Sequence, residues 1–475
     1  MVGVYVMRIV LGVPSVPQTQ GVILTDPALL TLCELAAFVK TGLTRRGLSR
    51  AQVLPEVRGA FSGEVMVDTL VQGSLGAVAR TFNAVVKLLA EAGDFPRAVH
   101  AVVDCTDCEA TPKCRMRGGG PVAHGTRHKR PDHRHNRHAP KGATTVWGWK
   151  VWLLFCPVSG IPIAVSGDRI NVDDRVWMVA LVLQGQANLG PRLKTVAFDR
   201  GFWDGQELHR VAQHVPFFIP GKADLEITPE ARRAALDVAA RQQQGRPVAD
   251  AVLATRPITV VTGKGQRRCE ERQALIVIGL PGLDCPTYAG EPPGSKVHSQ
   301  SFVPGRLNAA VVIADPSSPS ADPAEPLVIL TCAPLATPQD VLFAYDRFDA
   351  RGVIEHAGNK QAKREWTLET PLEKSEAAVD RHVYLVFLLM GLLAAFRAQQ
   401  AAEPTAAARG EDTGMARYRR AVERATRDKV LVRDGDCYAI LWAWELAVLA
   451  GLRLRWHPTD TAATLRARYG GGPAP

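Results

Sequence analysis

The 475-residue chain lacks the features that would place it in several large classes of protein. Its nine cysteines are too few for a disulfide scaffold and odd in number, so we expect reduced thiols. Its longest apolar run, 383–396, has 14 residues, whereas a membrane-spanning helix needs roughly 20. Its apolar N-terminus is interrupted by Arg8 and has no basic residues before it, which is not typical of a signal peptide. We therefore expect a cytoplasmic protein with no membrane partner.

A strong charge imbalance and a phosphate-binding glycine loop are also missing. Lys and Arg number 57 against 47 Asp and Glu, and a formal net charge of +10 permits a polyanionic partner without requiring one. Gly263-Lys264-Gly265 does not have the spacing of an NTPase loop. The apolar content of 46% excludes a disordered chain. At about 150 residues per domain, the length predicts about three structural units.

The patterns along the chain predict a mixed sheet with helices packed on it, because short apolar strands alternate with helical periodicity between 98 and 220. The loop-like stretch 115–141 interrupts this alternation. We predict five regions, which are a helical region 1–95, a first part of the α/β core 96–222, a β-containing insertion 223–326, a second part of the core 327–397, and a helical region 398–475 with an apolar helix over 437–451.

Three acids stand out by position. Asp104 and Asp199 each end a short apolar strand. After the insertion and a strand over 327–331, Glu355 lies in a helical pattern that runs from Thr337 to about Lys363. Acids at strand ends can meet at one edge of a sheet, and three carboxylates would provide the oxygen ligands that Mg²⁺ prefers. Two such cations can hold the attacking and leaving oxygens of a phosphodiester. A single acid at a strand end is more often a solvated cap, so the hypothesis depends on all three together.

Four stretches carry a family resemblance. They are Val102-Val103-Asp104-Cys105-Thr106, then Gly148-Trp149-Lys150-Val151, then Ala197-Phe198-Asp199-Arg200-Gly201-Phe202 with Phe217-Phe218-Ile219-Pro220-Gly221-Lys222, and finally Leu330-Thr331 followed by Phe348, Arg351, Ile354, Glu355 and Lys363. In this order they resemble the DDE transposases of bacterial insertion sequences, in the cut-and-paste branch with a β-rich insertion before the catalytic Glu. The resemblance covers about 98–397.

The resemblance implies a fold and an activity. The fold would be α/β, with a ribonuclease-H-like mixed sheet flanked by helices, a β-rich insertion before the catalytic Glu helix and a helical N-terminal region. Asp104, Asp199 and Glu355 would hold two Mg²⁺ or Mn²⁺ ions. With these ions the enzyme would cleave double-stranded DNA at the element ends and then join the freed 3′-OH to target DNA. The family also implies a homodimer in the DNA complex, associated with the nucleoid when DNA is bound.

The last stretch departs from the family signature of Tyr, two residues, Arg, three residues, Glu, six residues and Lys. Phe348 replaces the Tyr, although Tyr345 one turn earlier could compensate, and Lys363 comes one residue late. On a helix, Arg351 would lie beside Glu355, orient it and reach a DNA phosphate. We therefore predict DNA contacts for Arg351, Lys363 and, beside the second acid, Arg200.

The loop 115–141 and the residues before it are rich in Cys, His and basic residues. Three thiols and an imidazole could form a structural zinc site, or the loop could carry free Cys and His; the candidate ligands are Cys105, Cys108, Cys114 and His124. Basic side chains in the loop could follow a DNA backbone, or the loop could be merely solvated; these residues are Arg127, Lys129, Arg130, Arg134 and Arg137.

Two other functions remain open on the same residues. One is a domesticated or decayed transposase that binds DNA without cleaving it, which the departures at Phe348 and Lys363 favour. The other is a nuclease of the same fold that performs no strand transfer. The presence of all three acids favours an active enzyme.

Overall fold

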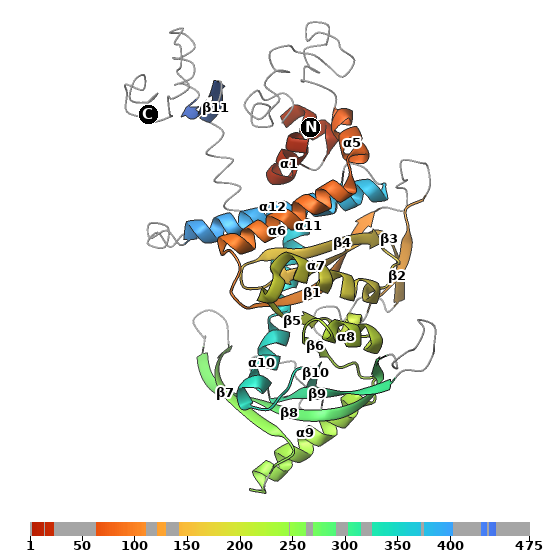
Figure 1. Cartoon of the computed structure of the whole chain (residues 1–475), viewed down its shortest axis with the longest axis vertical. Coiled ribbons are helices and arrows are strands. Elements are labelled where there is room, and N and C mark those ends of the chain that lie inside the picture. Colours follow the sequence, from red (N-terminus) through yellow and green to blue (C-terminus); the bar gives the residue numbers. More distant parts are fainter. Residues whose placement is uncertain are drawn as a thin grey trace. The chain divides into compact units, whose positions relative to one another are not determined.

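The computed structural model describes two compact units, drawn in Figure 1. One unit comprises 1–79, 111–122 and 362–475, and the other comprises 80–110 and 123–361. The residues that the structure describes are 2–13, 15–22, 63–110, 121–129, 142–246, 248–262, 269–290, 303–314, 325–371, 375–401, 429–434 and 437–442.

The second unit is built on one mixed sheet of ten strands, flanked by helices (Figure 1). The strands run in the order β2-β3-β1-β5-β6-β10-β9-β8-β7, with β4 paired to β3. Their bounds are β1 Val99–Ala110, β2 His124–Lys129, β3 Gly142–Cys156, β4 Ile161–Arg169, β5 Leu193–Phe198, β6 Phe217–Pro220, β7 Val252–Thr262, β8 Cys269–Gly290, β9 Val303–Ala314 and β10 Leu327–Thr331.

The helices of this unit cover the sheet with small and aliphatic side chains. Helix α7 packs against β4, α8 and α9 against β8, and α10 against β7. Buried residues of α9 recur at helical spacing, at Ile227, Ala231, Ala235 and Val238. The bounds are η3 Asp174–Trp177, α7 Met178–Leu189, η4 Gly190–Arg192, η5 Arg200–Phe202, α8 Gly205–Ala212, α9 Ile227–Gln243, α10 Pro338–Asp349 and η7 Ile354–Lys360.

The segment 223–326 does not form a separate sheet. Its strands β7, β8 and β9 pair antiparallel in sequence order, and β9 then pairs with β10. Because β10 also pairs with β6, the segment extends the sheet that carries β1 and β5.

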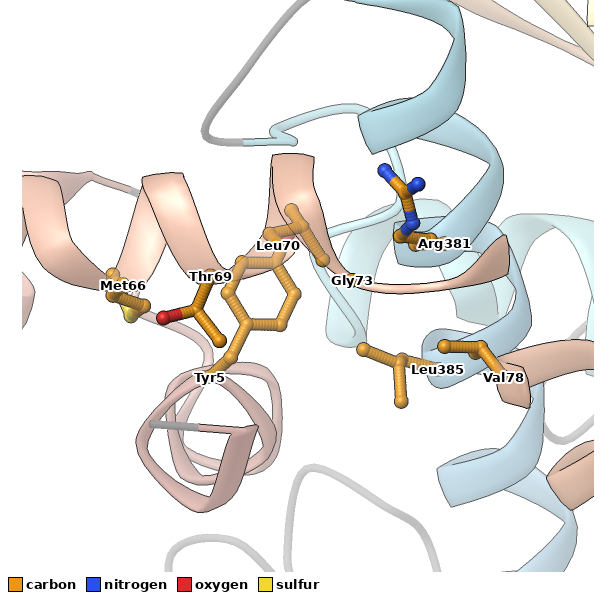
Figure 2. Close-up of a pocket in the computed structure, with 8 residues that line it drawn as sticks. All are labelled: Tyr5, Met66, Thr69, Leu70, Gly73, Val78, Arg381 and Leu385. Carbon is orange, nitrogen blue, oxygen red and sulfur yellow. The ribbon is translucent and has the colours of Figure 1, made fainter. Parts of the chain in front are cut away.

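The other unit is mainly helical. Tyr5 donates its hydroxyl hydrogen to Nδ1 of His382 at 2.8 Å, and the two side chains are almost completely buried. Figure 2 shows the side chains that line a small apolar pocket between α1, α5 and α12. The pocket has a volume of about 60 Å³, and Arg381 beside it donates a hydrogen bond to the Val71 carbonyl. The bounds are α1 Val2–Leu11, α2 Val16–Val22, α5 Gly63–Gln72, α12 Glu376–Ala401, β11 Lys429–Asp434 and β12 Cys437–Trp442, while α6 Leu75–Ala92 and α11 Gln361–Glu365 cross the boundary between units.

Helix α12 extends beyond the apolar run predicted from the sequence. Among the described residues, α12 alone is long and apolar enough to cross a membrane by length and composition, over Ala378–Gln399, with a mean hydropathy of 1.7. In the structure, 56% of this stretch is buried within the chain, and α12 packs against α1 and α5. The core helix of a soluble protein passes the same test.

Three sequence-based expectations are corrected. The stretch 115–141 is not all loop, because it contains β2, which pairs with the first residues of β3. The residues of β2 have a weak intrinsic preference for strand, and β2 forms because the long strand β3 offers it a free edge to pair with. The helix predicted over 437–451 is wrong at its start, where β12 pairs with β11. Gly435-Asp436 between two apolar runs is the hairpin signal that identifies this pair. The single helix expected from Thr337 to Lys363 is divided into α10, η7 and α11.

Candidate active site

The first two predicted acids lie side by side on neighbouring parallel strands. β1 and β5 pair in parallel register, and the last pair of that ladder joins Val103 to Phe198. Asp104 and Asp199 are the residues that directly follow this pair. Asp104 does not end its strand, since β1 continues to Ala110 along β3. It marks the point where β5 ends and β1 loses its parallel neighbour.

Asp104 is a largely buried acid held by two hydrogen bonds. The backbone N–H of Cys105 donates to Oδ1 at 2.8 Å, and Nδ2 of Asn359 donates to Oδ2 at 2.9 Å. The pKa of Asp104 is raised to about 6, mainly because burial disfavours the ionised carboxylate and to a lesser degree because of the charge of the neighbouring Asp199. The two donors and Arg351 oppose that shift. Asp104 therefore favours a positively charged partner.

Asp199 receives its partners from two directions. As the N-cap of η5, its side chain accepts the N–H of Arg200 at 2.7 Å. Arg351 contributes an ion pair, with Nη1 at 2.6 Å from Oδ1 of Asp199. The Arg351 guanidinium also lies over the Phe348 ring, 5.2 Å from its centroid. Arg351 is thus held between an acid and an aromatic ring, and the acid is Asp199 rather than the predicted Glu355.

The hydroxyl that Phe348 lacks is not replaced at the surface by Tyr345. Tyr345 is only 6% exposed, and the guanidinium of Arg256 lies over its ring, with 5.9 Å between Cζ of Arg256 and the ring centroid. Arg256 is itself held by two hydrogen bonds to Asp346. A DNA phosphate therefore does not reach this tyrosine in the arrangement described.

Glu355 is not brought together with the two aspartates. Its side chain is 62% exposed and forms an ion pair with Lys360, with 3.1 Å between Oε1 and Nζ. Among the described residues, no group of three or more His, Cys, Asp or Glu is placed to hold a metal ion. The structure thus assembles two of the three predicted acids, and the role of Glu355 stays a prediction.

The segment that carries Glu355 is a π-helix, η7. A π-helix closes its hydrogen bonds over five residues rather than four, so it holds one residue more per turn. Glu355 and Lys360 are five residues apart and are neighbours in such a helix. Lys363 belongs to the other unit, where its Nζ lies 2.9 Å from Oε1 of Glu369.

Sequence reasoning missed Asn359, the residue that contacts Asp104. It is 5% exposed, and its Oδ1 is buried without a hydrogen-bond partner among the described residues. The four-residue spacing of an α-helix would place Asn359 on the same face as Glu355, whereas in the π-helix Glu355 is exposed and Asn359 is buried, so the spacing gives no signal for Asn359.

Sequence reasoning also missed the contacts around Cys105, which follows Asp104 on β1. Nζ of Lys150 and Nε1 of Trp152 both donate to Oδ1 of Asp174, at 2.9 and 3.1 Å. Burial, followed by the charges of Asp174 and Asp104, raises the pKa of the Cys105 thiol well above its ordinary value. Cys105 is therefore a neutral thiol here, and Lys150 of the second resembling stretch is used in an internal ion pair.

The predicted zinc ligands are only partly described. Cys105 and Cys108 lie three apart on β1, which directs them to opposite faces of the strand. His124 begins β2 and packs its ring against Trp147, with 4.7 Å between centroids, while Cys114 lies outside the described residues. The structure does not bring Cys105 and Cys108 together, so it adds no support for zinc.

The predicted DNA contacts are also only partly described. Arg200 is exposed beside Asp199, and Arg127 and Lys129 lie on β2. The other three basic positions of the loop lie outside the described residues, namely Arg130, Arg134 and Arg137.

The donor set at this point of the sheet fits a divalent cation with hard ligands. The carboxylates of Asp104 and Asp199 and the amide of Asn359 offer oxygen atoms as ligands. Mg²⁺ and Mn²⁺ prefer ligands of this kind. Asp104, Asp199 and Glu355 are each paired with a residue of the segment 351–360, namely Asn359, Arg351 and Lys360. A cation would therefore replace the ion pairs of Asp199 and Glu355 and the amide hydrogen bond of Asp104.

Comparison with known proteins gives little. No protein-family model matches the chain, and no curated protein matches it. Among solved structures, a piggyBac transposase synaptic complex with hairpin DNA, studied by cryo-EM, matches over 88% of this chain and 68% of that chain, with a TM-score of 0.36 and 9% sequence identity. A likeness at this level carries no argument about function.

Proposed function

We propose that this protein is a DDE-type transposase that cleaves double-stranded DNA at the ends of an element and joins the freed strands to target DNA. The observation that carries the proposal is the adjacency of Asp104 and Asp199 after the last β1–β5 pair. The order of the three acids along the chain agrees with the resemblance to insertion-sequence transposases, whereas Arg351 pairs with Asp199 and not with Glu355. The mixed sheet flanked by helices is compatible with a ribonuclease-H-like core.

The acids of the chain would hold the catalytic cations. Asp104 and Asp199 supply carboxylate oxygens from the sheet, and Glu355 supplies a third after leaving Lys360. Two Mg²⁺ or Mn²⁺ ions, when bound, activate the attacking hydroxyl and stabilise charge on the phosphodiester. Catalysis of this kind depends on positioning and electrostatics.

The basic residues of the segment 351–360 would exchange partners when DNA binds. Arg351 lies between Asp199 and the Phe348 ring, so its guanidinium needs only to release the acid in order to reach a phosphate. Lys360 is 41% exposed and can likewise exchange Glu355 for a phosphate. In this proposal the protein acts as a homodimer on DNA in the cytoplasm, associated with the nucleoid.

A cleavage assay tests this function. The full chain is incubated with Mg²⁺ or Mn²⁺ and DNA that carries the ends of its encoding element, and nicked and joined products are measured. We expect metal-dependent nicking at the boundary, reduced by at least about a hundredfold in Asp199→Asn and Glu355→Gln. Asp284→Asn is the matched control, because Asp284 also pairs with an arginine but on an exposed part of β8.

The other outcomes identify the alternatives. Nicking without joined products indicates a nuclease of the same fold. If the unchanged chain and all the variants bind DNA without cleaving it, the protein is a domesticated or decayed transposase. The exposure of Glu355 and its ion pair with Lys360 favour this alternative. Normal cleavage by Asp199→Asn would contradict the proposed site itself.

A further inference from the structure

Helix η7 presents two oxygen-bearing residues in opposite ways. Glu355 is exposed and paired with Lys360, whereas Asn359 is 5% exposed and reaches Asp104. Ile354 and Gly358 of the same helix are buried, and the Gly358 Cα faces Leu153 of β3. The buried face of η7 is thus fixed against the sheet, and it directs Asn359 rather than Glu355 toward the aspartates.

The Asn359 amide is only half satisfied. Its Nδ2 donates to Oδ2 of Asp104, but Oδ1 is buried and has no hydrogen-bond partner within the described part of the chain. A buried carbonyl oxygen without a donor or a cation is unfavourable, and a cation bound at this oxygen would satisfy it.

The surroundings indicate what that partner is. The amide contacts Asp104, and Asp104 lies next to Asp199 at the end of the β1–β5 ladder. Carboxylate and amide oxygens together bind hard divalent cations. A half-turn about the Cβ–Cγ bond exchanges Oδ1 and Nδ2, and which of them faces Asp104 follows the hydrogen-bond partners present. The same side chain can therefore donate to Asp104 without a cation and ligate a cation bound there.

We propose that Asn359 is a ligand of the cation held by Asp104 and Asp199, through its amide oxygen. This inference depends on the proposed function, since it concerns the same cation site. Asn359 adds a neutral ligand to the two carboxylates, so two negative charges match one divalent cation while Glu355 is still paired with Lys360. It also avoids burying a third carboxylate beside two others before the cation arrives.

Mn²⁺ binding to the full chain without DNA tests the inference. The free Mn²⁺ signal is followed by electron paramagnetic resonance as protein is added. We expect Asn359→Leu, which keeps the size but removes the donors, to weaken Mn²⁺ binding at least about tenfold. Asn359→Asp, which keeps an oxygen ligand and adds charge, should bind Mn²⁺ at least as tightly as the unchanged protein.

Asn188→Leu is the matched control. Asn188 is also 5% exposed in the same unit, but its amide donates to Asn83 and to the Ile163 carbonyl in a position apart from the acids. It should lose stability in thermal unfolding without a change in Mn²⁺ affinity. Asp199→Asn serves as the reference for loss of the cation site.

The outcomes separate the two proposals. If Asp199→Asn loses Mn²⁺ while folded Asn359→Leu binds it normally, the ligand role of Asn359 is overturned and the cation site stands. If Asn359→Leu does not fold, Asn359→Asp decides, and weaker binding than the unchanged protein overturns the inference. If the unchanged protein binds no Mn²⁺, or Asp199→Asn binds it equally well, both proposals fail.

Discussion

At the scale of single residues, Asp104 is an acid that folding largely removes from water. Burial raises its pKa from an ordinary 3.8 to about 6, so the folded chain holds this proton more tightly than the unfolded chain does. The stability that the protonated form provides is complete below the unfolded pKa, and it is lost as the pH rises through the folded pKa. At 1.36 kcal/mol per unit, the metal-free chain loses about 3 kcal/mol by neutral pH.

The first prediction concerns this penalty. Asp104→Asn should raise the free energy of unfolding at pH 7.5 by up to about 3 kcal/mol, because an amide at this position has no charge to bury. The gain should disappear at pH 4, where the wild-type carboxyl is largely protonated in the folded chain. Urea denaturation at both pH values in a metal-free buffer measures it. An equal gain at both pH values would show that the effect is packing and not ionisation.

At the scale of elements, the second acid depends on a close contact between α8 and β8. A Cβ on Gly205, the first residue of α8, would overlap the backbone carbonyl of Thr287 in β8. Beyond this contact, the His209 ring packs on Tyr288 with 5.2 Å between centroids. Asp204 caps the helix and accepts the N–H groups of the next turn. The insertion thus supports the turn that follows Asp199.

The second prediction follows from this contact. Gly205→Ala should lower the free energy of unfolding by about 3 kcal/mol or more, because two backbones must separate to admit one methyl group. Urea denaturation of the full chain measures the loss. Gly352→Ala is the control, since a Cβ at Gly352 meets no heavy atom within 4 Å, and it should unfold like the unchanged protein. Equal stability of the two variants would contradict the close approach of α8 and β8.

Some helices, strands and contacts of the site could be predicted from the sequence, and others could not. The strand at 327–331 was predicted at its observed bounds, because apolar runs between turn residues are a local signal. The adjacency of Asp104 and Asp199 also followed from acids after short strands. The contacts of 351–360 could not be predicted, because η7 departs from the four-residue spacing on which the expectation for Arg351 and Glu355 depended. The strand β2 depends on a partner about 20 residues away, and its own residues give no strand signal.

At the scale of the whole molecule, the net charge of +10 is spread unevenly along the chain. Five of the basic side chains fall within 127–137, a stretch with a single acid, Asp132. If this stretch follows a DNA backbone, each side chain that contacts a phosphate releases condensed counterions. The logarithm of the binding constant then falls with the logarithm of salt concentration, with a slope of about 0.9 per phosphate contact.

The third prediction applies this relation to the full chain. Replacing the five basic residues by Gln should make the salt dependence of DNA binding shallower by up to about 4.5 logarithmic units per decade, roughly 0.9 for each lost contact. The residues are Arg127, Lys129, Arg130, Arg134 and Arg137. Fluorescence anisotropy with labelled duplex DNA between 50 and about 200 mM salt gives the slope. Arg306→Gln is the control, because Arg306 is an exposed arginine on β9 that forms an ion pair with Asp284. It should leave the salt dependence of DNA binding unchanged. An unchanged slope in the fivefold variant would assign this stretch to solvent and direct the search for the DNA surface to Arg200 and Arg351 beside the acids.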